Sequence, residues 1–357
     1  MSAGLRSLLV APQWIGDAVM AQPLAGLLQA RGERVTALAL PGVADVLRAM
    51  PGVDTVLETR FAHGRLDWRA RVALAAQLRT QGFARAYVLG NNVKARLVPW
   101  LARVPVRVGW SGEAAGALLT HAWHDAAGAA RADLREHYAQ LAGAVPARAL
   151  GAPPLPAAPP ESIAQPRLRV DAARAADTAR GCGLETPFVV LCPGAEYGPA
   201  KQWPAQHYAA LARLAHAAGW RVALLGSARE RDIAQAIAQA AEASGDAWLV
   251  DLCGRTTMAQ AIDLLGVAAG VVSNDSGLMH VAAALGRPTV GLYGSTDPRH
   301  TPPAAHHSAT LWLHLPCSPC FRRTCPLGHA NCLRALDPEW AWSALRGLVD
   351  AAQRAHA

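Results

Sequence analysis

Short apolar segments alternate with longer amphipathic or alanine-rich segments along both halves of the chain. Such runs are typical of buried strands in a parallel sheet, and the segments between them are long enough for crossover helices. In the first half, the pattern predicts strands over 7–11, 34–40, 53–57 and 86–89 and helices over 18–30 and 44–50. In the second half, it predicts strands over 188–192, 221–225, 248–252, 270–272 and 289–293, and helices ending near 217 and spanning 228–242, 276–285 and 339–355. The predicted fold class is therefore α/β.

A stretch rich in alanine and proline, 144–165, separates the two halves and is typical of an extended linker. The chain has 357 residues, which is too long for one ordinary core. We therefore expect an N-terminal domain over 1–150, a linker over 151–166 and a C-terminal domain over 167–357. Two such domains on one linker are expected to leave a deep cleft between them.

Polar residues follow several predicted strands at their carboxyl ends. After the strand at 270–272 comes Ser273–Gly277, and His280 lies one helical turn beyond Ser276. Ligands bind at this edge of an open α/β sheet, where free helix N–H groups and the helix dipole favour phosphate. The alternative interpretation is structural, with Asp275 as a helix N-terminal residue and His280 as a buried histidine. Similar polar stretches at corresponding strand ends favour a binding site.

Asp17 lies at the turn after the first predicted strand. From pattern alone, capping of the next helix is favoured, and a general base in a cleft is the alternative. Lys201 lies in a loop rich in glycine and proline after the strand at 188–192. It either neutralises charge on a departing phosphate without a metal or is a surface lysine, and the residues alone leave both interpretations open.

The formal net charge is +8, and the isoelectric point is about 9.5. This charge favours an anionic partner: nucleic acid, an acidic membrane surface, or a phosphorylated glycan or nucleotide sugar. Nucleic acid is disfavoured because no aromatic interleaving, zinc-finger spacing or reader motif accompanies the charge. The arginines between 60 and 107 are expected to lie mostly on solvated helix faces, with one or two available to phosphate or carboxylate.

Neither a secretory signal nor a membrane span is predicted. The apolar run at 8–11 is short and is followed by Pro12, and no apolar stretch approaches the ~20 residues of a span. An odd number of cysteines, seven, in an α/β-patterned chain indicates a reducing cytosol. We therefore expect a cytoplasmic protein.

Four cysteines are closely spaced near the C-terminus, with His329 among them: Cys317, Cys320, Cys325 and Cys332. Four soft ligands at short spacing suit a structural zinc site. Reduced thiols packed under a loop are at least as good an explanation, because the spacing is not that of a standard finger.

Two nucleotide motifs are excluded. Gly181-Cys182-Gly183 lacks the third glycine of a dinucleotide fingerprint and precedes a strand instead of following one. A G-x-x-x-x-G-K-[ST] loop is absent from the sequence. Both NAD chemistry and ATP hydrolysis are therefore disfavoured.

Four segments form a recognisable set: Trp14-Ile15-Gly16-Asp17, Pro193-Gly194-Ala195-Glu196 with Pro199-Ala200-Lys201, Asn274-Asp275-Ser276-Gly277 with His280, and Tyr293–Pro298. Together they resemble the bacterial ADP-heptose–lipopolysaccharide heptosyltransferases, a family of inverting glycosyltransferases. The resemblance covers almost the whole chain and implies the GT-B fold, with two Rossmann-like domains facing each other across a cleft. The Cys317–Cys332 segment and the Pro-Gly-Ala-Glu loop look most like the type II enzymes, which add the second heptose of the inner core.

The resemblance implies metal-independent transfer from the donor ADP-L-glycero-D-manno-heptose, bound mainly by the C-terminal domain. Asp17 would be the catalytic base in the N-terminal domain, and Lys201 would stabilise the leaving ADP. The implied donor-binding residues are Glu196, Lys201, Glu230, Met258, Asp275, Ser276, Gly277 and His280.

On the acceptor side, Leu89–Lys94 resembles a family segment and implies contacts from Asn92 and Lys94, with Gly90 and Asn92 standing where the family usually has Pro and Ser. The implied acceptor is a Kdo- and heptose-bearing lipid A core at the inner face of the cytoplasmic membrane, contacted peripherally. Two alternatives stay open: heptosyltransferase I or another core heptosyltransferase with a different acceptor, and a non-catalytic ADP-sugar-binding protein.

Overall fold

The computed structural model describes residues 4–61, 66–112, 115–123, 133–143, 163–184, 187–243 and 247–356. The chain divides into two compact units, Met1–Pro166 and Arg167–Ala357, each with its own sheet. The linker expected over 151–166 lies outside the described residues as far as residue 162. Among the described helices, none is long and apolar enough to cross a membrane.

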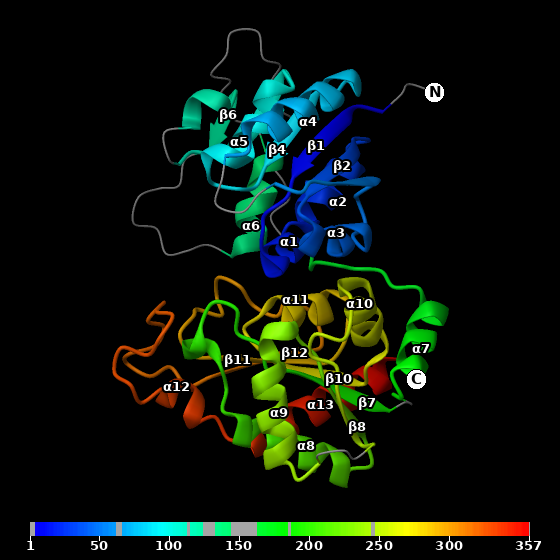
Figure 1. Cartoon of the computed structure of the whole chain (residues 1–357), viewed down its shortest axis with the longest axis vertical. Coiled ribbons are helices and arrows are strands. Elements are labelled where there is room, and N and C mark those ends of the chain that lie inside the picture. The colour runs from blue at the N-terminus through cyan, green and yellow to red at the C-terminus, as the bar shows by residue number, and fades with distance from the viewer. Residues whose placement is uncertain are drawn as a thin grey trace. The chain divides into compact units, whose positions relative to one another are not determined.

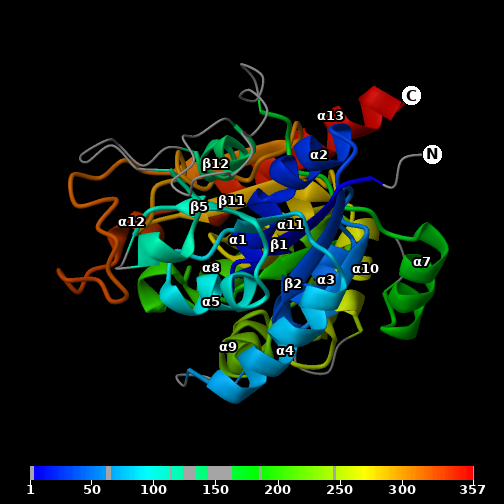
Figure 2. The same cartoon turned by 90° about the horizontal axis from the view of Figure 1, so that it is seen from above.

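The N-terminal unit holds a six-stranded parallel sheet in the order β3-β2-β1-β4-β5-β6. Its strands are β1 (Arg6–Val10), β2 (Arg34–Ala39), β3 (Thr55–Glu58), β4 (Arg85–Val88), β5 (Val106–Trp110) and β6 (His121–Trp123). Its helices are α1 (Ile15–Met20), α2 (Gln22–Ala30), α3 (Pro41–Arg48), α4 (Trp68–Thr80), α5 (Val93–Leu101) and α6 (Leu134–Ala139). Helices α4 and α5 cover one face of the sheet, and α1, α2, α3 and α6 lie on the other (Figure 1, Figure 2).

The C-terminal unit holds a second parallel sheet, in the order β12-β11-β10-β7-β8-β9. Its strands are β7 (Phe188–Cys192), β8 (Arg221–Leu224), β9 (Leu249–Asp251), β10 (Gly270–Asn274), β11 (Thr289–Tyr293) and β12 (Ser308–Trp312). Its helices are α7 (Ala172–Gly181), α8 (Ala205–Ala217), α9 (Arg231–Ala240), α10 (Met258–Val267), α11 (Gly277–Ala284), α12 (Asn331–Arg334) and α13 (Pro338–His356). Counted from its own first strand, this sheet has the same order as the other, which is the Rossmann order.

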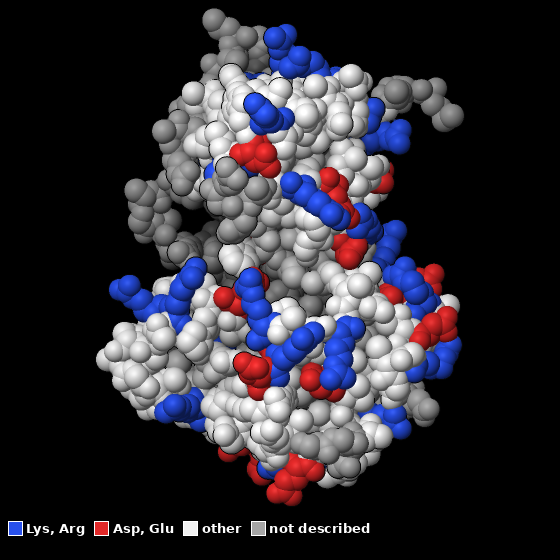
Figure 3. All heavy atoms as spheres, viewed as in Figure 1, with Lys and Arg blue, Asp and Glu red and all other residues white. Residues whose placement is uncertain are grey.

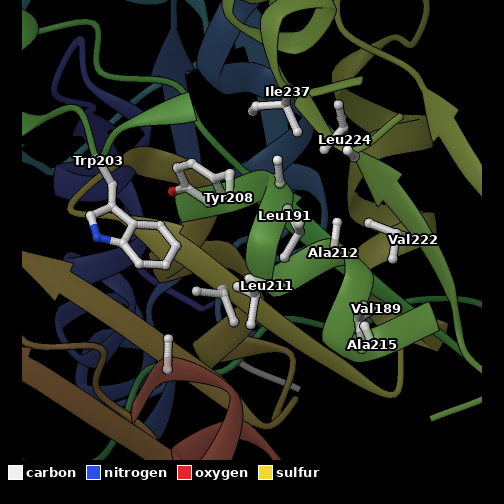
Figure 4. Close-up of a cluster of buried hydrophobic side chains, with 14 of the residues drawn as sticks. Val189, Leu191, Trp203, Tyr208, Leu211, Ala212, Ala215, Val222, Leu224 and Ile237 are labelled. Carbon is white, nitrogen blue, oxygen red and sulfur yellow. The ribbon is translucent and has the colours of Figure 1, made fainter. Parts of the chain in front are cut away.

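The core of the C-terminal unit lies between the sheet and helices α8, α9 and α13 (Figure 4). Trp203 and Tyr208 are both completely buried in it, beside Leu191 and Leu211. Trp203 precedes α8 by two residues, so the loop that enters this helix is fixed to the core at its end.

The structure differs from the predicted elements in two respects. The helix predicted over 18–30 is two helices, α1 and α2, because Pro23 at the second position of α2 has no N–H with which to continue α1. The structure also contains β5, β6 and β12, which were not predicted. In β5, Arg107 interrupts the apolar run, and its guanidinium donates to the carbonyls of Leu118 and Val104.

The surface charge is dispersed on the face shown in Figure 3, where Lys and Arg side chains are interspersed with Asp and Glu. Two arginines of the segment from 60 to 107 are instead buried. Arg71 and Arg96 are 5% and 1% exposed, and each donates hydrogen bonds to backbone carbonyls. These two residues are therefore exceptions to the solvated helix faces expected for most of these arginines.

Candidate functional site

The candidate residues follow the strands at which each sheet reverses its order. In the N-terminal unit these strands are β1 and β4, which precede Asp17 and Lys94. In the C-terminal unit they are β7 and β10, which precede Lys201 and Asp275. At such a reversal, the connections that leave two neighbouring strands go to opposite faces of the sheet, and a crevice remains beyond the carboxyl ends of the strands. Open α/β sheets bind ligands in this crevice.

A charged cluster centres on Asp275, whose side chain is 6% exposed. Its Oδ2 accepts a 2.6 Å hydrogen bond from Lys201 Nζ and a 2.5 Å bond from Thr296 Oγ1. His280 Nε2 lies 3.8 Å from the other carboxylate oxygen. The structure thus brings three predicted donor-site residues together and adds Thr296, which the sequence reasoning missed.

The electrostatics of this cluster keep Asp275 ionised. Burial alone would raise the pKa of its carboxyl, but the nearby His280 and the charge and hydrogen bond of Lys201 outweigh burial and hold the pKa well below the ordinary value of 3.8. The Lys201 side chain is 15% exposed, so the ammonium is only partly shielded from solvent. A cation held in this way can face an anionic ligand without moving far.

Asn274 fixes the loop that carries Lys201. Its side-chain carbonyl accepts from the backbone N–H of Trp203 at 3.1 Å, and its amide nitrogen donates to the carbonyl of Pro193 at 2.8 Å. Because Asn274 is fully buried, these bonds tie both ends of the 193–203 loop to the end of β10. Asn274 therefore acts structurally, one residue before the carboxylate that Lys201 contacts.

The N-terminus of α11 lies beside this cluster. Ser276 is its N-cap, yet the Ser276 side chain makes no capping bond to the helix and instead shares a 3.0 Å hydrogen bond with Ser273 Oγ. The N–H groups of the first turn, which begins at Gly277, thus have no side-chain cap in the described part of the chain. Such a terminus is suited to phosphate oxygens.

The other predicted donor residues differ in their contacts and in their burial. Glu230 completes a capping box, in which its Oε2 accepts from the backbone N–H and the hydroxyl of Ser227 at 2.7 and 2.6 Å. Glu196 pairs with Arg229 at 3.2 Å on the exposed surface. Met258 is half-buried at the first position of α10. One carboxylate oxygen of Glu230 is thus already engaged in structure.

Asp17 lines a cavity of about 600 Å³ in the N-terminal unit. It lies in the first turn of α1, whose N-cap is Trp14, so the expectation that Asp17 itself starts the helix as its cap was wrong. Tyr138 of α6 also lines the cavity, and its pKa is raised, first by burial and then by the charge of Asp17. A carboxylate therefore lies at the wall of a hollow large enough for a sugar.

The predicted acceptor residues line the same cavity. Asn92 caps α5 by accepting from the backbone N–H of Ala95 at 3.0 Å, which leaves its amide nitrogen for other contacts. Lys94 lies in the first turn of that helix. Arg71 of α4 is a further lining residue, which the sequence reasoning had placed only within a basic segment.

The four clustered cysteines line one small cavity of about 20 Å³. All seven cysteines are free thiols, and within the described ranges no group of three or more His, Cys, Asp or Glu side chains is arranged to hold a metal ion. The geometry of the described residues therefore gives no support to the zinc interpretation.

The cysteine-rich segment has a structural relation to the Lys201 loop. The Arg323 carbonyl accepts from the backbone N–H of Ala200 at 3.0 Å, and the Phe321 carbonyl accepts from the Tyr197 hydroxyl at 2.8 Å. A Cβ on Gly198 would lie 2.5 Å from the Arg323 carbonyl oxygen, so the two backbones meet where only glycine fits. The cysteine-rich segment thus packs against the Lys201 loop and is hydrogen-bonded to it.

Comparisons with known proteins match most of the chain. Residues 71–331 match the family model described as glycosyltransferase family 9 (heptosyltransferase). Lipopolysaccharide heptosyltransferase 2 of Escherichia coli K12 is 36% identical over 315 residues, which cover 87% of this chain and 88% of that protein. Lipooligosaccharide heptosyltransferase 2 of Haemophilus influenzae is 34% identical over 317 residues, covering 86% of this chain and 88% of that one.

A solved structure is similar over nearly the full length. The structure of Escherichia coli ADP-heptose LPS heptosyltransferase II matches with a TM-score of 0.84 at 32% identity, covering 98% of this chain and 100% of that chain. The prediction of an α/β GT-B fold with two Rossmann-like sheets is confirmed.

Proposed function

Because the chain belongs to glycosyltransferase family 9 (heptosyltransferase), we propose that it transfers L-glycero-D-manno-heptose from ADP-heptose to the first heptose of the lipopolysaccharide inner core. This is the type II reaction. The observation that carries the proposal is the Lys201–Asp275 pair beside the uncapped start of α11, at the point where the sheet of the C-terminal unit reverses its order.

On the donor side, the pyrophosphate of ADP-heptose binds between Lys201 and the N–H groups that begin at Gly277. The leaving ADP gains negative charge as the glycosidic bond breaks, and the ammonium and the helix terminus stabilise that charge. Asp275 holds Lys201 in place, Thr296 donates to the same carboxylate oxygen, and His280 lies near the other oxygen of this buried carboxylate. Because this arrangement already supplies positive charge, the reaction needs no divalent metal.

The nucleoside part of the donor is assigned to three further residues. Glu230 accepts from ribose hydroxyls with the carboxylate oxygen that the capping box leaves open. Met258 packs against the adenine from the start of α10. Glu196 lies on the loop between β7 and Lys201, where it borders the donor.

On the acceptor side, Asp17 acts as general base. It takes the proton from the attacking heptose hydroxyl as that oxygen bonds to the anomeric carbon and ADP leaves from the opposite face, so the configuration inverts. Asn92 and Lys94 contact the acceptor in the same cavity. The lipid-linked acceptor implies peripheral contact with the inner face of the cytoplasmic membrane, to which a net charge of +8 is suited.

The test is ADP release from ADP-heptose by the wild type and by Asp17→Asn, each offered Kdo2-lipid A with and without its first heptose. We expect release only with the heptosylated acceptor and a loss of about 100-fold or more in the variant. Release with the unheptosylated acceptor would move the assignment to the type I reaction. Tight binding of ADP-heptose without release on either acceptor would favour a non-catalytic ADP-sugar-binding protein.

A further inference from the structure

Arg71 is a buried cation at the wall of the N-terminal cavity. Only 5% of the residue is exposed. Its Nε donates to the carbonyl of Leu66 at 2.6 Å, its Nη1 donates to the carbonyl of Lys94 at 2.7 Å, and its guanidinium carbon lies 4.0 Å from the centre of the Phe61 ring. Three neighbours thus fix the plane of the guanidinium.

The third arm of this guanidinium has no partner among the residues that the structure describes. Within the described ranges, Nη2 of Arg71 makes no hydrogen bond, and no carboxylate lies within ion-pair distance of the side chain. Burial lowers the pKa of Arg71, and the charge of Asp67 offsets this only in part. Because arginine stays protonated even so, the guanidinium carries a positive charge that no described carboxylate contacts directly.

The other residues that line the cavity indicate which kind of ligand would pair with this charge. Lys94 adds a second cation to the lining, and Asp17 is the sole carboxylate among the described residues that form it. A ligand that satisfies all three groups has an anionic group for the cations and a hydroxyl for the carboxylate.

We propose that Arg71 and Lys94 form an anion subsite that recognises an acidic group of the acceptor, a carboxylate or a phosphate, and so presents the acceptor hydroxyl to Asp17. The inference rests on the proposed function and deepens it. It makes Arg71 a specificity-determining residue, because a neutral sugar of the same shape leaves the buried guanidinium without its partner.

A purely structural role for Arg71 makes a different prediction. If Arg71 only ties the backbones of Leu66 and Lys94 together, its replacement weakens every acceptor equally. If it binds the acidic group, the loss depends on the acceptor's charge. The experiment therefore varies the enzyme and the acceptor together.

The kinetic experiment compares wild type, Arg71→Gln and Arg69→Gln on three acceptors: heptosylated Kdo2-lipid A, the same with its Kdo carboxylates reduced to alcohols, and the same without lipid A phosphates. Arg69 is an exposed residue of α4 outside the cavity lining and serves as the matched control. We expect Arg71→Gln to lower kcat/KM on the intact acceptor by about 10- to 100-fold, with the KM for ADP-heptose unchanged.

On the acceptor that lacks the recognised group, the same substitution is expected to cost less than about threefold. The acceptor on which Arg71→Gln no longer lowers kcat/KM identifies the recognised group, which is either the Kdo carboxylate or the lipid A phosphate. An equal loss on all three acceptors would overturn the proposal, as would a loss in Arg69→Gln of the same size.

A binding measurement keeps this inference separate from the proposed reaction. Lys94 and Lys201 are the only lysines in the sequence, so reductive ¹³C-methylation places one side-chain reporter in each site. Titration with inorganic phosphate is expected to shift the Lys94 signal in wild type and not in Arg71→Gln. The Lys201 signal is expected to respond alike in both proteins. A Lys94 signal that is unmoved in wild type, or moved equally in the variant, would overturn the anion subsite even if heptose transfer is found.

Discussion

Lys201 donates a 2.6 Å hydrogen bond to Asp275, although 74 positions separate the two residues in the chain. They meet because β7 and β10 are neighbours in the sheet, and each residue lies in the segment that follows its strand. In the proposed function this contact both stabilises the fold and positions the cation for the donor, and the two roles can be separated experimentally.

Replacing Lys201 with Met removes the cation and leaves the buried carboxylate of Asp275 with less positive charge nearby. We expect the free energy of unfolding to fall by about 3 kcal/mol and ADP release to fall by about 100-fold or more. The double variant Lys201→Met with Asp275→Asn is expected to recover part of the stability and none of the activity. Urea unfolding and an ADP-release assay measure the two effects.

The control for that cycle is Arg180→Ala, which breaks the exposed Arg180–Asp177 pair on α7. Because exposed pairs contribute little, its effect on unfolding is expected to stay below about 0.5 kcal/mol. A Lys201→Met variant as stable as this control would contradict a formed Lys201–Asp275 pair.

The low pKa of Asp275 predicts a particular pH dependence of stability. The folded-state pKa lies below the ordinary value of 3.8, so the ionised carboxyl stabilises the protein above that value, and the contribution is lost as the pH falls towards the folded-state pKa. The difference in unfolding free energy between wild type and Asp275→Asn is expected to be constant above about pH 5 and to shrink below about pH 4. A difference that shrinks between pH 8 and 6 would show that another group is responsible.

Glu230 has a structural and a proposed binding role, and two substitutions separate them. Glu230→Gln can keep the hydrogen bonds from Ser227, so we expect stability to change by less than about 0.5 kcal/mol while the KM for ADP-heptose rises severalfold. Glu230→Ala also loses the capping box and is expected to cost about 1 kcal/mol of stability. Unchanged donor KM in both variants would limit Glu230 to capping.

Metal removal is expected to leave turnover intact. In the proposed reaction, Lys201 and the start of α11 supply the positive charge that stabilises the leaving ADP. Excess EDTA in the assay is therefore expected to change the rate of ADP release by less than about twofold. A large loss that added Mg²⁺ restores would contradict this mechanism.

Local patterns in the sequence were sufficient to locate the main strands and the polar segments that follow them. Because side-chain alternation and apolar runs are local, they identify β7 and β10 and place Lys201 and Asp275 after them. Sequence patterns could not show that these two residues touch, because strand order in a sheet is a property of the whole unit. For the same reason, Thr296 was not recognised as a partner of Asp275.

For the arginines, the sequence failed to show which side chains are buried. From the sequence, Arg71 and Arg96 were indistinguishable from exposed neighbours such as Arg69. They are buried because their guanidinium groups reach backbone carbonyls of other segments, including those of Lys94 and Gly112. Such partners are distant in sequence or lie on irregular backbone, so the helical periodicity of the sequence does not reveal them.

The buried amide of Asn274 also bears on how the donor enters. Active-site loops rich in glycine and proline often act as hinged lids that open for substrate and close over it. Here the 193–203 loop is joined to β10 by Asn274 and to the core by Trp203, so opening it would break buried hydrogen bonds and expose an indole. We expect hydrogen exchange of this loop to be as slow as that of β10. ADP-heptose would then meet a preformed surface, and none of its binding energy would be spent on ordering Lys201.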